Sequence, residues 1–399
     1  MMAGRLTLAF LRTESSAGLA PVATAVVALM LANSPLADSY FAFLAHRLPM
    51  VVGSFSHTAS IADWIKDGLM AVFFLIVGLE IKFEVLRGAL SSPRRLATPL
   101  LAAAGGMFAP ALVYLAVNAG PTGTVQGWPV GTPTDIAFAL TALAVAGRGL
   151  PPSLRLFLMT LAIADDFGAV VLIAVLFTHA LNWAALAGAG AVLALLAALS
   201  RRRRGPILLY AAGFALVWAF CLSSGVSTSV AGVACALTVP VGARRPGGES
   251  MLTLFMDALH PWVAYVILPA FAFSAAGFSF AGLTGRDVAS PVSLGIALAL
   301  CLGKPAGIFG VTFLAHGLKI GRRPAGASWL ELLGVAALAG VGFTMSLYLG
   351  ALAFAGAAAD AQREVRLGIL AGSLISVLAG ALLIRLAARR HPATGIAPQ

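Results

Sequence analysis

The stretch Ala162-Ile163-Ala164-Asp165-Asp166-Phe167-Gly168 places two adjacent carboxylates inside an apolar segment that runs from about residue 153 to 178. A segment of this length can cross the hydrocarbon core of a bilayer as one helix. An aspartate at the bilayer centre costs about 2.5 to 3.5 kcal/mol, and such residues normally face a water-filled cavity on an ion or proton pathway. Asp165 and Asp166 are therefore predicted to form a transport site. The alternative is a pair that only accepts hydrogen bonds between packed helices.

The composition of the chain is that of a membrane protein. Of its 399 residues, 60% are hydrophobic and 10% are charged, and the mean hydropathy is +0.96. A soluble globule of this length could not bury so much apolar surface. Apolar runs of about 20 residues, enough to span a bilayer, predict an all-α polytopic protein. Its twelve transmembrane helices are expected near residues 17–34, 59–81, 96–117, 130–147, 153–178, 182–200, 206–222, 225–241, 255–281, 291–316, 330–355 and 364–388.

The distribution of positive charge indicates how the chain is oriented. There are 26 Lys and Arg against 15 Asp and Glu, an excess that would also suit nucleic-acid binding. The two termini and every even-numbered connection hold 20 of these basic residues, whereas the odd-numbered connections hold five. This alternation follows the positive-inside rule, so it predicts two cytoplasmic termini and no nucleic-acid partner. The densest cluster is interpreted as a topology anchor, with a site for anionic lipid as the alternative; it consists of Arg201, Arg202, Arg203 and Arg204.

Two of the predicted spans are interrupted. In the fourth, Pro129-Val130-Gly131-Thr132-Pro133 precedes Thr134 and Asp135, which suit a helix N-cap, so a helix should restart near Thr134. In the eleventh, Leu338-Ala339-Gly340-Val341-Gly342 weakens the helix at a corresponding place. Matching interruptions in two halves of a chain indicate an inverted-repeat transporter with its site near the bilayer midplane. The two repeats would be spans 3 to 5 and 10 to 12.

Each interruption leaves helix ends that carry partial charges. The N-terminus of a helix bears about half a positive charge and the C-terminus about half a negative charge. Asp135 is suited to balance the positive pair of ends. Lys304, inside the tenth span, is predicted either to balance the negative pair or to form a salt bridge with Asp165 or Asp166. The oxygens of the two aspartates, when ionised, would suit a hard cation such as Na+.

The second predicted span carries three further acidic candidates. Glu80 and Glu84 lie on one helix face at the cytoplasmic end, as a solvated helix end or as part of a sensor of cytoplasmic pH. Asp67 lies towards the opposite mouth, where it would form a salt bridge or attract cations. The connection before this span contains the β-prone Met50-Val51-Val52, which favours a short hairpin.

In order along the chain, several motifs resemble those of the NhaA-type sodium/proton antiporters, a system that is also a known example of inverted repeats. The resemblance extends through nearly the whole chain. Its motifs are Met70-Ala71-Val72-Phe73-Phe74 with Val77-Gly78-Leu79-Glu80, Thr134-Asp135-Ile136-Ala137-Phe138-Ala139-Leu140, Leu161-Ala162-Ile163-Ala164-Asp165-Asp166, His260-Pro261-Trp262-Val263-Ala264-Tyr265, Gly303-Lys304-Pro305 and Gly342-Phe343-Thr344-Met345-Ser346.

The resemblance implies a fold, a location and an activity. It implies twelve helices with discontinuous crossing helices at spans 4 and 11, in the inner membrane of a bacterium. It implies a homodimer, joined partly by the first periplasmic hairpin, that exchanges Na+ or Li+ for protons without a cofactor and without enzymatic activity. Residues 96–178 and 291–388 would form the transporting core, and residues 17–81 and 182–281 the interface part.

The resemblance also implies roles for individual residues. Asp165 and Asp166 match the cation and proton carriers, Thr134 and Asp135 the partners at the unwound helix, and Lys304 the core lysine. Positions linked to pH activation match Glu80, Glu84 and His260. The chain departs from the family pattern at Ser227, where a histidine is usual, and at Pro133, where alanine is usual. The transport site is thus expected to be intact, whereas competition of protons and Na+ at the aspartates could replace a separate pH sensor.

Three other functions are rivals to ion exchange. A sodium-coupled solute symporter can share discontinuous helices but needs a pocket for an organic substrate, and the sequence has no surplus polar cluster for one. A membrane-embedded enzyme would need a nucleophile or metal-ligand histidines, and the six histidines are scattered over different spans and loops. A cation channel is the third rival.

Overall fold

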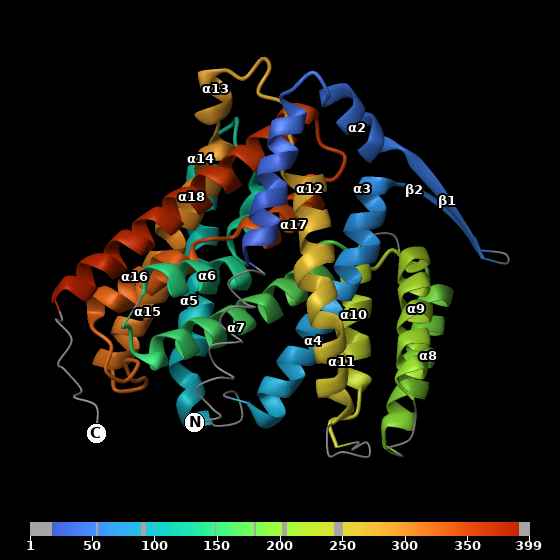
Figure 1. Ribbon diagram of the computed structural model, residues 1–399, viewed down its shortest axis with the longest axis horizontal. Helices are drawn as coiled ribbons and strands as arrows, with labels where there is room; N and C mark the ends of the chain where they lie inside the picture. The colour runs from blue at the N-terminus through green and yellow to red at the C-terminus, as the bar shows by residue number, and fades with distance from the viewer. Residues whose placement is uncertain are drawn as a thin grey trace. The chain divides into compact units, whose positions relative to one another are not determined.

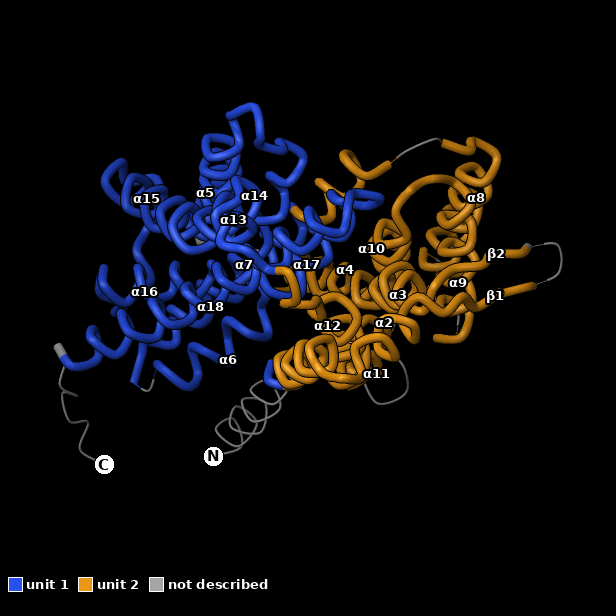
Figure 2. Tube along the Cα trace, turned by 90° about the horizontal axis from the view of Figure 1, so that it is seen from above, with its two compact units in different colours: residues 1–19, 92–168, 283–399 blue, residues 20–91, 169–282 orange. Residues whose placement is uncertain are grey.

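The computed structural model of the protein describes residues 18–52, 55–88, 93–147, 149–178, 181–201, 206–242 and 250–390. The chain divides into two compact units, which are coloured separately in Figure 2. Unit 1 contains residues 1–19, 92–168 and 283–399, and unit 2 contains residues 20–91 and 169–282. Both are mainly helical (Figure 1), as expected where no water is present to satisfy backbone groups.

The helices confirm a polytopic membrane protein. Within the described ranges, seven helices are long and apolar enough to cross a membrane. They are Ala97–Val117, Pro152–Leu176, Trp183–Arg201, Ile207–Ser224, Met251–Ala276, Pro291–Gly317 and Ala359–Arg389. Three bent pairs raise the number to ten if each pair is one span: Gly18–Ala32 with Ala37–Ala45, Val125–Gly131 with Ile136–Ala146, and Trp329–Ala339 with Phe343–Ala353. The number twelve stays a prediction.

Unit 1 contains the two interrupted spans. Its elements are α5 (Pro93–Val117), the 3-10 helix η3 (Val125–Gly131), α6 (Ile136–Ala146), the larger part of α7 (Pro152–Leu176), α13 (Gly285–Val288), α14 (Pro291–Leu298), the π-helical turn η5 (Ala299–Gly303), α15 (Lys304–Gly317), α16 (Trp329–Ala339), α17 (Phe343–Ala353) and α18 (Ala359–Arg390). The bends at the two interruptions are 46° between η3 and α6 and 43° between α16 and α17.

Helices α5 and α15 of unit 1 approach one another closely at a glycine. A β-carbon placed on Gly307 would lie 2.1 Å from the Gly105 carbonyl oxygen and 2.7 Å from the β-carbon of Ala109. Small residues permit such contacts between transmembrane helices, where van der Waals packing replaces the hydrophobic effect as the source of association. This contact fixes α15 one turn after Lys304, the residue at which the helix begins.

Unit 2 contains the predicted hairpin. Its elements are the larger part of the helix Gly18–Ala32, α2 (Ala37–Ala45), β1 (Arg47–Val52), β2 (Phe55–Ser60), α3 (Ile61–Trp64), the π-helical turn η1 (Ile65–Leu69), α4 (Met70–Arg87), the last residues of α7, α8 (Trp183–Arg201), α9 (Ile207–Ser224), α10 (Thr228–Thr238), α11 (Met251–Trp262), the π-helical turn η4 (Val263–Ile267) and α12 (Leu268–Ala276). Strands β1 and β2 pair antiparallel, with Arg47 opposite Ser60 and Val52 opposite Phe55. The hairpin expected at Met50-Val51-Val52 is therefore confirmed.

Candidate ion-binding site

The fourth span is unwound between Gly131 and Ile136. Helix η3 ends where Pro133 approaches, because proline has no amide hydrogen and disfavours the helical conformation of the residue before it. The Thr132 hydroxyl donates to the Pro129 carbonyl at 2.8 Å, which closes the last turn of η3. Helix α6 then starts at Ile136 with Asp135 as its N-cap, so the helix restarts two residues after Thr134, near which the sequence predicts the restart.

The eleventh span is unwound over Gly340-Val341-Gly342, and its free backbone groups meet the first interruption. The Asp135 amide donates to the Val341 carbonyl at 2.7 Å. The Thr134 hydroxyl lies 3.0 Å from the carbonyl oxygen of Ala339, the last residue of α16. Two unwound segments, with Thr134 and Ala339 205 residues apart in sequence, thus satisfy each other's polar groups inside unit 1, which an apolar environment requires.

Asp135 lies at the N-termini of both restarting helices. Its Oδ1 accepts the Phe138 amide of α6 at 3.1 Å. Its Oδ2 accepts the Thr344 amide of α17 at 3.1 Å and the Thr344 hydroxyl at 2.6 Å. A carboxylate is the group that best compensates the partial positive charge of a helix N-terminus. One side chain therefore balances both positive ends, as its position in the sequence suggests.

Lys304 fulfils both of the roles that the sequence leaves open, the salt bridge with an aspartate and the compensation of a negative helix end. Its ammonium lies 2.5 Å from the Thr132 carbonyl, at the C-terminal end of η3, and 3.0 Å from Asp165 Oδ2. Its side chain is fully buried, and the π-helical turn η5 directly precedes it. Such turns inside α-helices are frequent at functional sites. The lysine is thus paired with Asp165 and also offsets one negative helix end.

The two aspartates of α7 are buried in unit 1, with 0% exposure for Asp165 and 2% for Asp166. Asp165 Oδ2 receives the Thr134 hydroxyl at 2.7 Å in addition to Lys304. Asp165 Oδ1 has no hydrogen-bond partner among the described residues. One oxygen of the carboxylate is thus held by the protein, while the other remains able to accept a proton or a cation.

The donor set of this region is made of oxygen atoms. The carboxylates of Asp165 and Asp166, the Thr134 hydroxyl and the carbonyls of the unwound segments are the ligands that hard cations prefer. Four buried ionisable side chains of the described part of unit 1 belong to this region, three carboxylates and one ammonium: Asp135, Asp165, Asp166 and Lys304. With all four ionised, the negative charge exceeds the positive, so the region favours a cation or added protons.

The structure brings most of the predicted residues together and adds others. Thr134 and Lys304 both contact Asp165 directly, and Asp135, which follows Thr134 in the chain, is bonded to Val341 and Thr344. The Thr132 carbonyl and the Ser373 hydroxyl, which accepts the Phe343 amide at 3.2 Å, are contacts that sequence reasoning missed. A backbone carbonyl carries no sequence signal, and Ser373 resembles any other small residue of an apolar helix.

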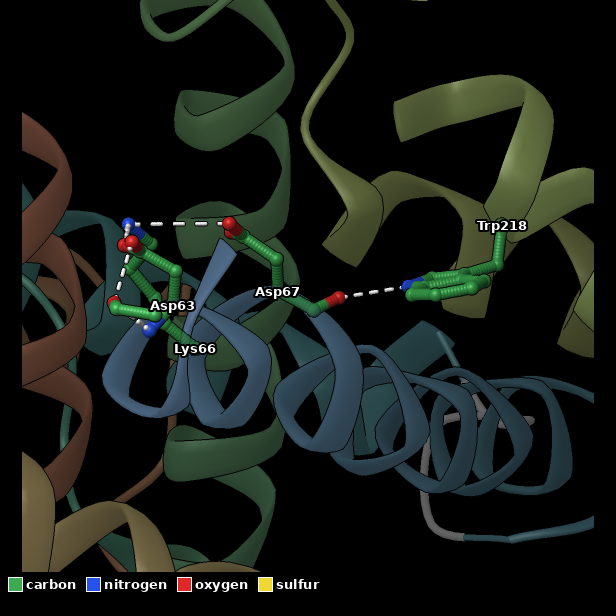
Figure 3. A network of polar contacts seen from close by, with 5 residues as sticks. Asp63, Lys66, Asp67 and Trp218 are labelled. Atoms are coloured by element: carbon green, nitrogen blue, oxygen red, sulfur yellow. Dashed lines mark hydrogen bonds and ion pairs between the residues drawn. The ribbon is translucent and has the colours of Figure 1, made fainter. Parts of the chain in front are cut away.

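Asp67 lies in unit 2, in the π-helical turn η1, and its surroundings are drawn in Figure 3. The Lys66 ammonium is 2.9 Å from Asp63 Oδ1 and 3.9 Å from Asp67 Oδ2. The Trp218 indole of α9 donates to the Asp67 carbonyl at 2.8 Å. Of the two predicted environments, the salt bridge is therefore present, and a role in attracting cations stays a prediction.

The pH-response candidates also lie in unit 2. Glu80 and Glu84 are on α4, four residues apart, and His260 is exposed near the end of α11. Between the glutamates, Lys82 donates to the carbonyls of Leu237 and Val239, at 2.6 and 2.5 Å, and so caps the C-terminus of α10.

Of the four consecutive arginines, Arg201 is exposed at the end of α8, and Arg202, Arg203 and Arg204 lie outside the described residues.

Comparison with known proteins gives a family assignment. The family described as Na+/H+ antiporter 1 matches residues 8–384. The Na(+)/H(+) antiporter NhaA 2 of Pseudomonas syringae pv. syringae (strain B728a) is 46% identical over 381 residues, which cover 96% of this chain and 95% of that protein. The Na(+)/H(+) antiporter NhaA of Caulobacter vibrioides is 47% identical over 389 residues, with 96% and 91% covered. The protein of the same name from Paramagnetospirillum magneticum is 49% identical over 378 residues, with 94% and 95% covered. The resemblance carried by the motifs is confirmed, and the chain belongs to the Na+/H+ antiporter 1 family.

Proposed function

We propose that this chain exchanges cytoplasmic Na+ for external protons across a bacterial inner membrane, for pH and sodium homeostasis. The observation that carries the proposal is the buried Asp165, with one oxygen bound to Lys304 and Thr134 and the other without a hydrogen-bond partner among the described residues. An ionisable group inside a membrane-spanning helix is a functional site by default. Membership of the antiporter family supports the same activity.

Exchange follows from competition at the two aspartates. When they are deprotonated, their oxygens bind Na+, and when they are protonated they lose the charge that attracts it. A site that opens alternately to each side of the membrane therefore releases one ion where it takes up the other. Coupling needs no further device, because Na+ and protons cannot occupy the same carboxylates together.

Thr134, Asp135 and Lys304 serve to hold the unwound segments in position. Asp135 and Lys304 compensate helix ends of opposite sign, and Thr134 joins Asp165 to the end of α16. Preorganised partners of this kind keep carbonyl and carboxylate oxygens available to the ion instead of to each other.

The cycle is expected to move net charge. If Asp165 and Asp166 each carry a proton inwards, two positive charges enter for every Na+ that leaves. Each net charge is worth about 2.3 kcal/mol per 100 mV of membrane potential, so a potential that is negative inside would drive Na+ export. Li+, a smaller hard cation, is proposed as a second substrate of the same site.

The rival functions are less well supported. The relatives that this chain matches over nearly their whole length are named antiporters. Their names favour exchange over sodium-coupled symport. A continuous channel needs no buried lysine paired with the ion-binding carboxylate. The family is one of transporters, which also disfavours a membrane-embedded enzyme.

The architecture proposed for the membrane has twelve crossings. Besides the seven helices and three bent pairs of membrane-spanning character, α4 and the short apolar α10 would each complete one. Both termini would be cytoplasmic, as the charge distribution favours, with the interruptions at spans 4 and 11 crossing one another. Residues 96–178 and 291–388 would act as the transporting core, and residues 17–81 and 182–281 as the interface part.

Several finer assignments complete the proposal. A homodimer is supported by β1 and β2, because an isolated two-stranded hairpin is marginally stable alone. Glu80, Glu84 and His260 remain pH-response candidates, Asp67 a candidate for attracting cations, and the arginines from Arg201 to Arg204 a candidate site for anionic lipid.

The test measures the fluorescence of a ΔpH-sensitive dye in everted vesicles. Na+ should dissipate the proton gradient with the natural chain, whereas Asp165→Asn and Asp166→Asn should reduce the response to the level of empty vesicles. Asparagine keeps the volume but neither ionises nor carries a proton. Asp38→Asn, at an exposed position on α2, is the matched control and should retain full exchange. Near-normal exchange in either site variant would remove that residue from the mechanism.

A further inference from the structure

The N-terminal turn of α17 depends on acceptors from other helices. Its N-cap residue is Gly342, which makes no side-chain cap. The first amides of a helix have no partner within it, and an amide left unsatisfied in a buried environment is costly. The Phe343 and Thr344 side chains are buried, so the acceptors for these two amides determine where the restarted helix begins.

Those acceptors are two residues that come from different elements. The Thr344 amide donates to Asp135 Oδ2, as described above. The Phe343 amide donates to the Ser373 hydroxyl oxygen of α18 at 3.2 Å. Ser373 is 6% exposed, so this contact lies inside unit 1, away from solvent.

Hydrogen bonds connect this turn to the ion-binding aspartate. Without Ser373, the Phe343 amide would lose this acceptor, and its neighbour Thr344 donates to Asp135 Oδ2 through both its amide and its hydroxyl. The Asp135 amide is bonded to Val341, and the adjacent Thr134 is bonded to Asp165. A shift at the start of α17 would therefore reach the Asp165 carboxylate through residues that are all in direct contact.

We propose that Ser373 is a positioning residue of the Na+ site. Its hydroxyl holds the first turn of α17, so that Asp135 can cap α6 and α17 together and Thr134 can point its hydroxyl at Asp165. The proposal rests on the Na+/H+ exchange inferred above and assigns a role to a helix, α18, that contributes no charged group to the site.

The chain offers a matched control in Ser376, one turn further along α18. Ser376 is 1% exposed, and a β-carbon placed on Gly340 would lie 2.7 Å from its hydroxyl, so it faces the same interruption. Its hydroxyl has no hydrogen-bond partner among the described residues. Serine to alanine at 373 and at 376 thus removes the same atom from the same helix face, but only the first removes an acceptor.

The experiment compares Ser373→Ala, Ser373→Thr and Ser376→Ala in proteoliposomes, with initial rates measured against Na+ concentration. Ser373→Ala should raise the apparent KM for Na+ about tenfold, the effect expected from a buried donor that loses its acceptor. Ser373→Thr retains the hydroxyl and should restore the natural KM, and Ser376→Ala should match the natural chain. Hydrogen exchange by mass spectrometry should show faster exchange of residues 341–346 in Ser373→Ala alone.

Other outcomes overturn the proposal. An unchanged KM in Ser373→Ala, or an equal change in Ser376→Ala, would show that the hydroxyl does not position the site. If Ser373→Ala fails to insert, the natural chain still provides a test, because rapid exchange of the Phe343 amide would exclude its bond to Ser373. The natural chain is assayed first, so an absence of Na+-dependent proton movement would count against the proposed function and not against this contact.

Discussion

At the scale of single residues, the pair of Lys304 and Asp165 shows how the chain keeps charges inside an apolar unit. Both side chains are fully buried, 3.0 Å apart. A buried pair contributes little net stability, because removing two ions from water offsets their attraction. Loss of one partner is different, since it leaves an uncompensated charge. The pair is therefore better understood as a means of keeping Asp165 ionisable than as a source of stability.

We expect Lys304→Gln to lower the free energy of unfolding by about 3 to 5 kcal/mol, the cost of breaking a buried pair from one side. The double variant Lys304→Gln with Asp165→Asn should regain most of that loss, because no unpaired charge remains. Thermal unfolding in detergent measures the stability of the single and of the double variant.

The matched control is Lys66→Gln in unit 2, whose ion pair is partly exposed. A pair of that kind contributes about 0 to 1 kcal/mol. Losses that simply add in the Lys304 and Asp165 double variant would show that the two residues do not interact.

At the scale of elements, the site is determined by where helices stop. Proline and glycine interrupt two spans, and the polar groups at the resulting helix ends are compensated by one carboxylate, one ammonium and the hydroxyls of Thr132, Thr134 and Ser373. The helices that carry these groups must also lie at fixed distances, which the contact of α5 with α15 illustrates. The Gly307 contact lies one turn after Lys304, so packing there sets how far the ammonium reaches.

Gly307→Ala should destabilise the protein by about 1 to 3 kcal/mol, the usual cost of overpacking, because the added methyl group meets the Gly105 carbonyl. Exchange activity should fall with it, since α15 must move away from α5. Gly310→Ala is the matched control on the same helix, where an added β-carbon meets nothing within 4 Å. Thermal unfolding measures the stability of both variants, and vesicle assays measure their exchange activity. Equal effects at the two positions would show that close packing at Gly307 is not the cause.

At the scale of the whole molecule, the proposed cycle converts membrane potential into a sodium gradient. Two carboxylates that take protons and release one Na+ move net charge, whereas a single titrating carboxylate would exchange one for one. The buried aspartates occur as a pair, and this arrangement is what favours movement of net charge over neutral exchange.

We expect an imposed potential to accelerate exchange when it is positive on the side from which protons are taken. Proteoliposomes with valinomycin and different potassium gradients set the potential, and a pH-sensitive dye reports the rate. Liposomes with equal potassium on both sides are the control. Rates indifferent to potential would limit the cycle to one proton for each Na+.

The sequence alone determined the properties that act locally along the chain. Hydropathy located the apolar segments, Pro133 and the glycines after Ala339 located the two interruptions, and the hairpin followed from the β-prone residues before the second span. The family was also evident from motifs. The ion-binding roles of the aspartates remain predictions that the vesicle assays address.

Only the tertiary structure decided which partners meet. Lys304 pairs with Asp165, and its ammonium also reaches the Thr132 carbonyl. Asp135 caps α6 and also α17, whose Thr344 lies 209 residues from it in sequence, and Ser373 supplies an acceptor to a helix it does not belong to. These contacts depend on how each helix is rotated about its axis and shifted along it against its neighbours. That information lies in the packing of many side chains at once, which no local stretch of sequence contains.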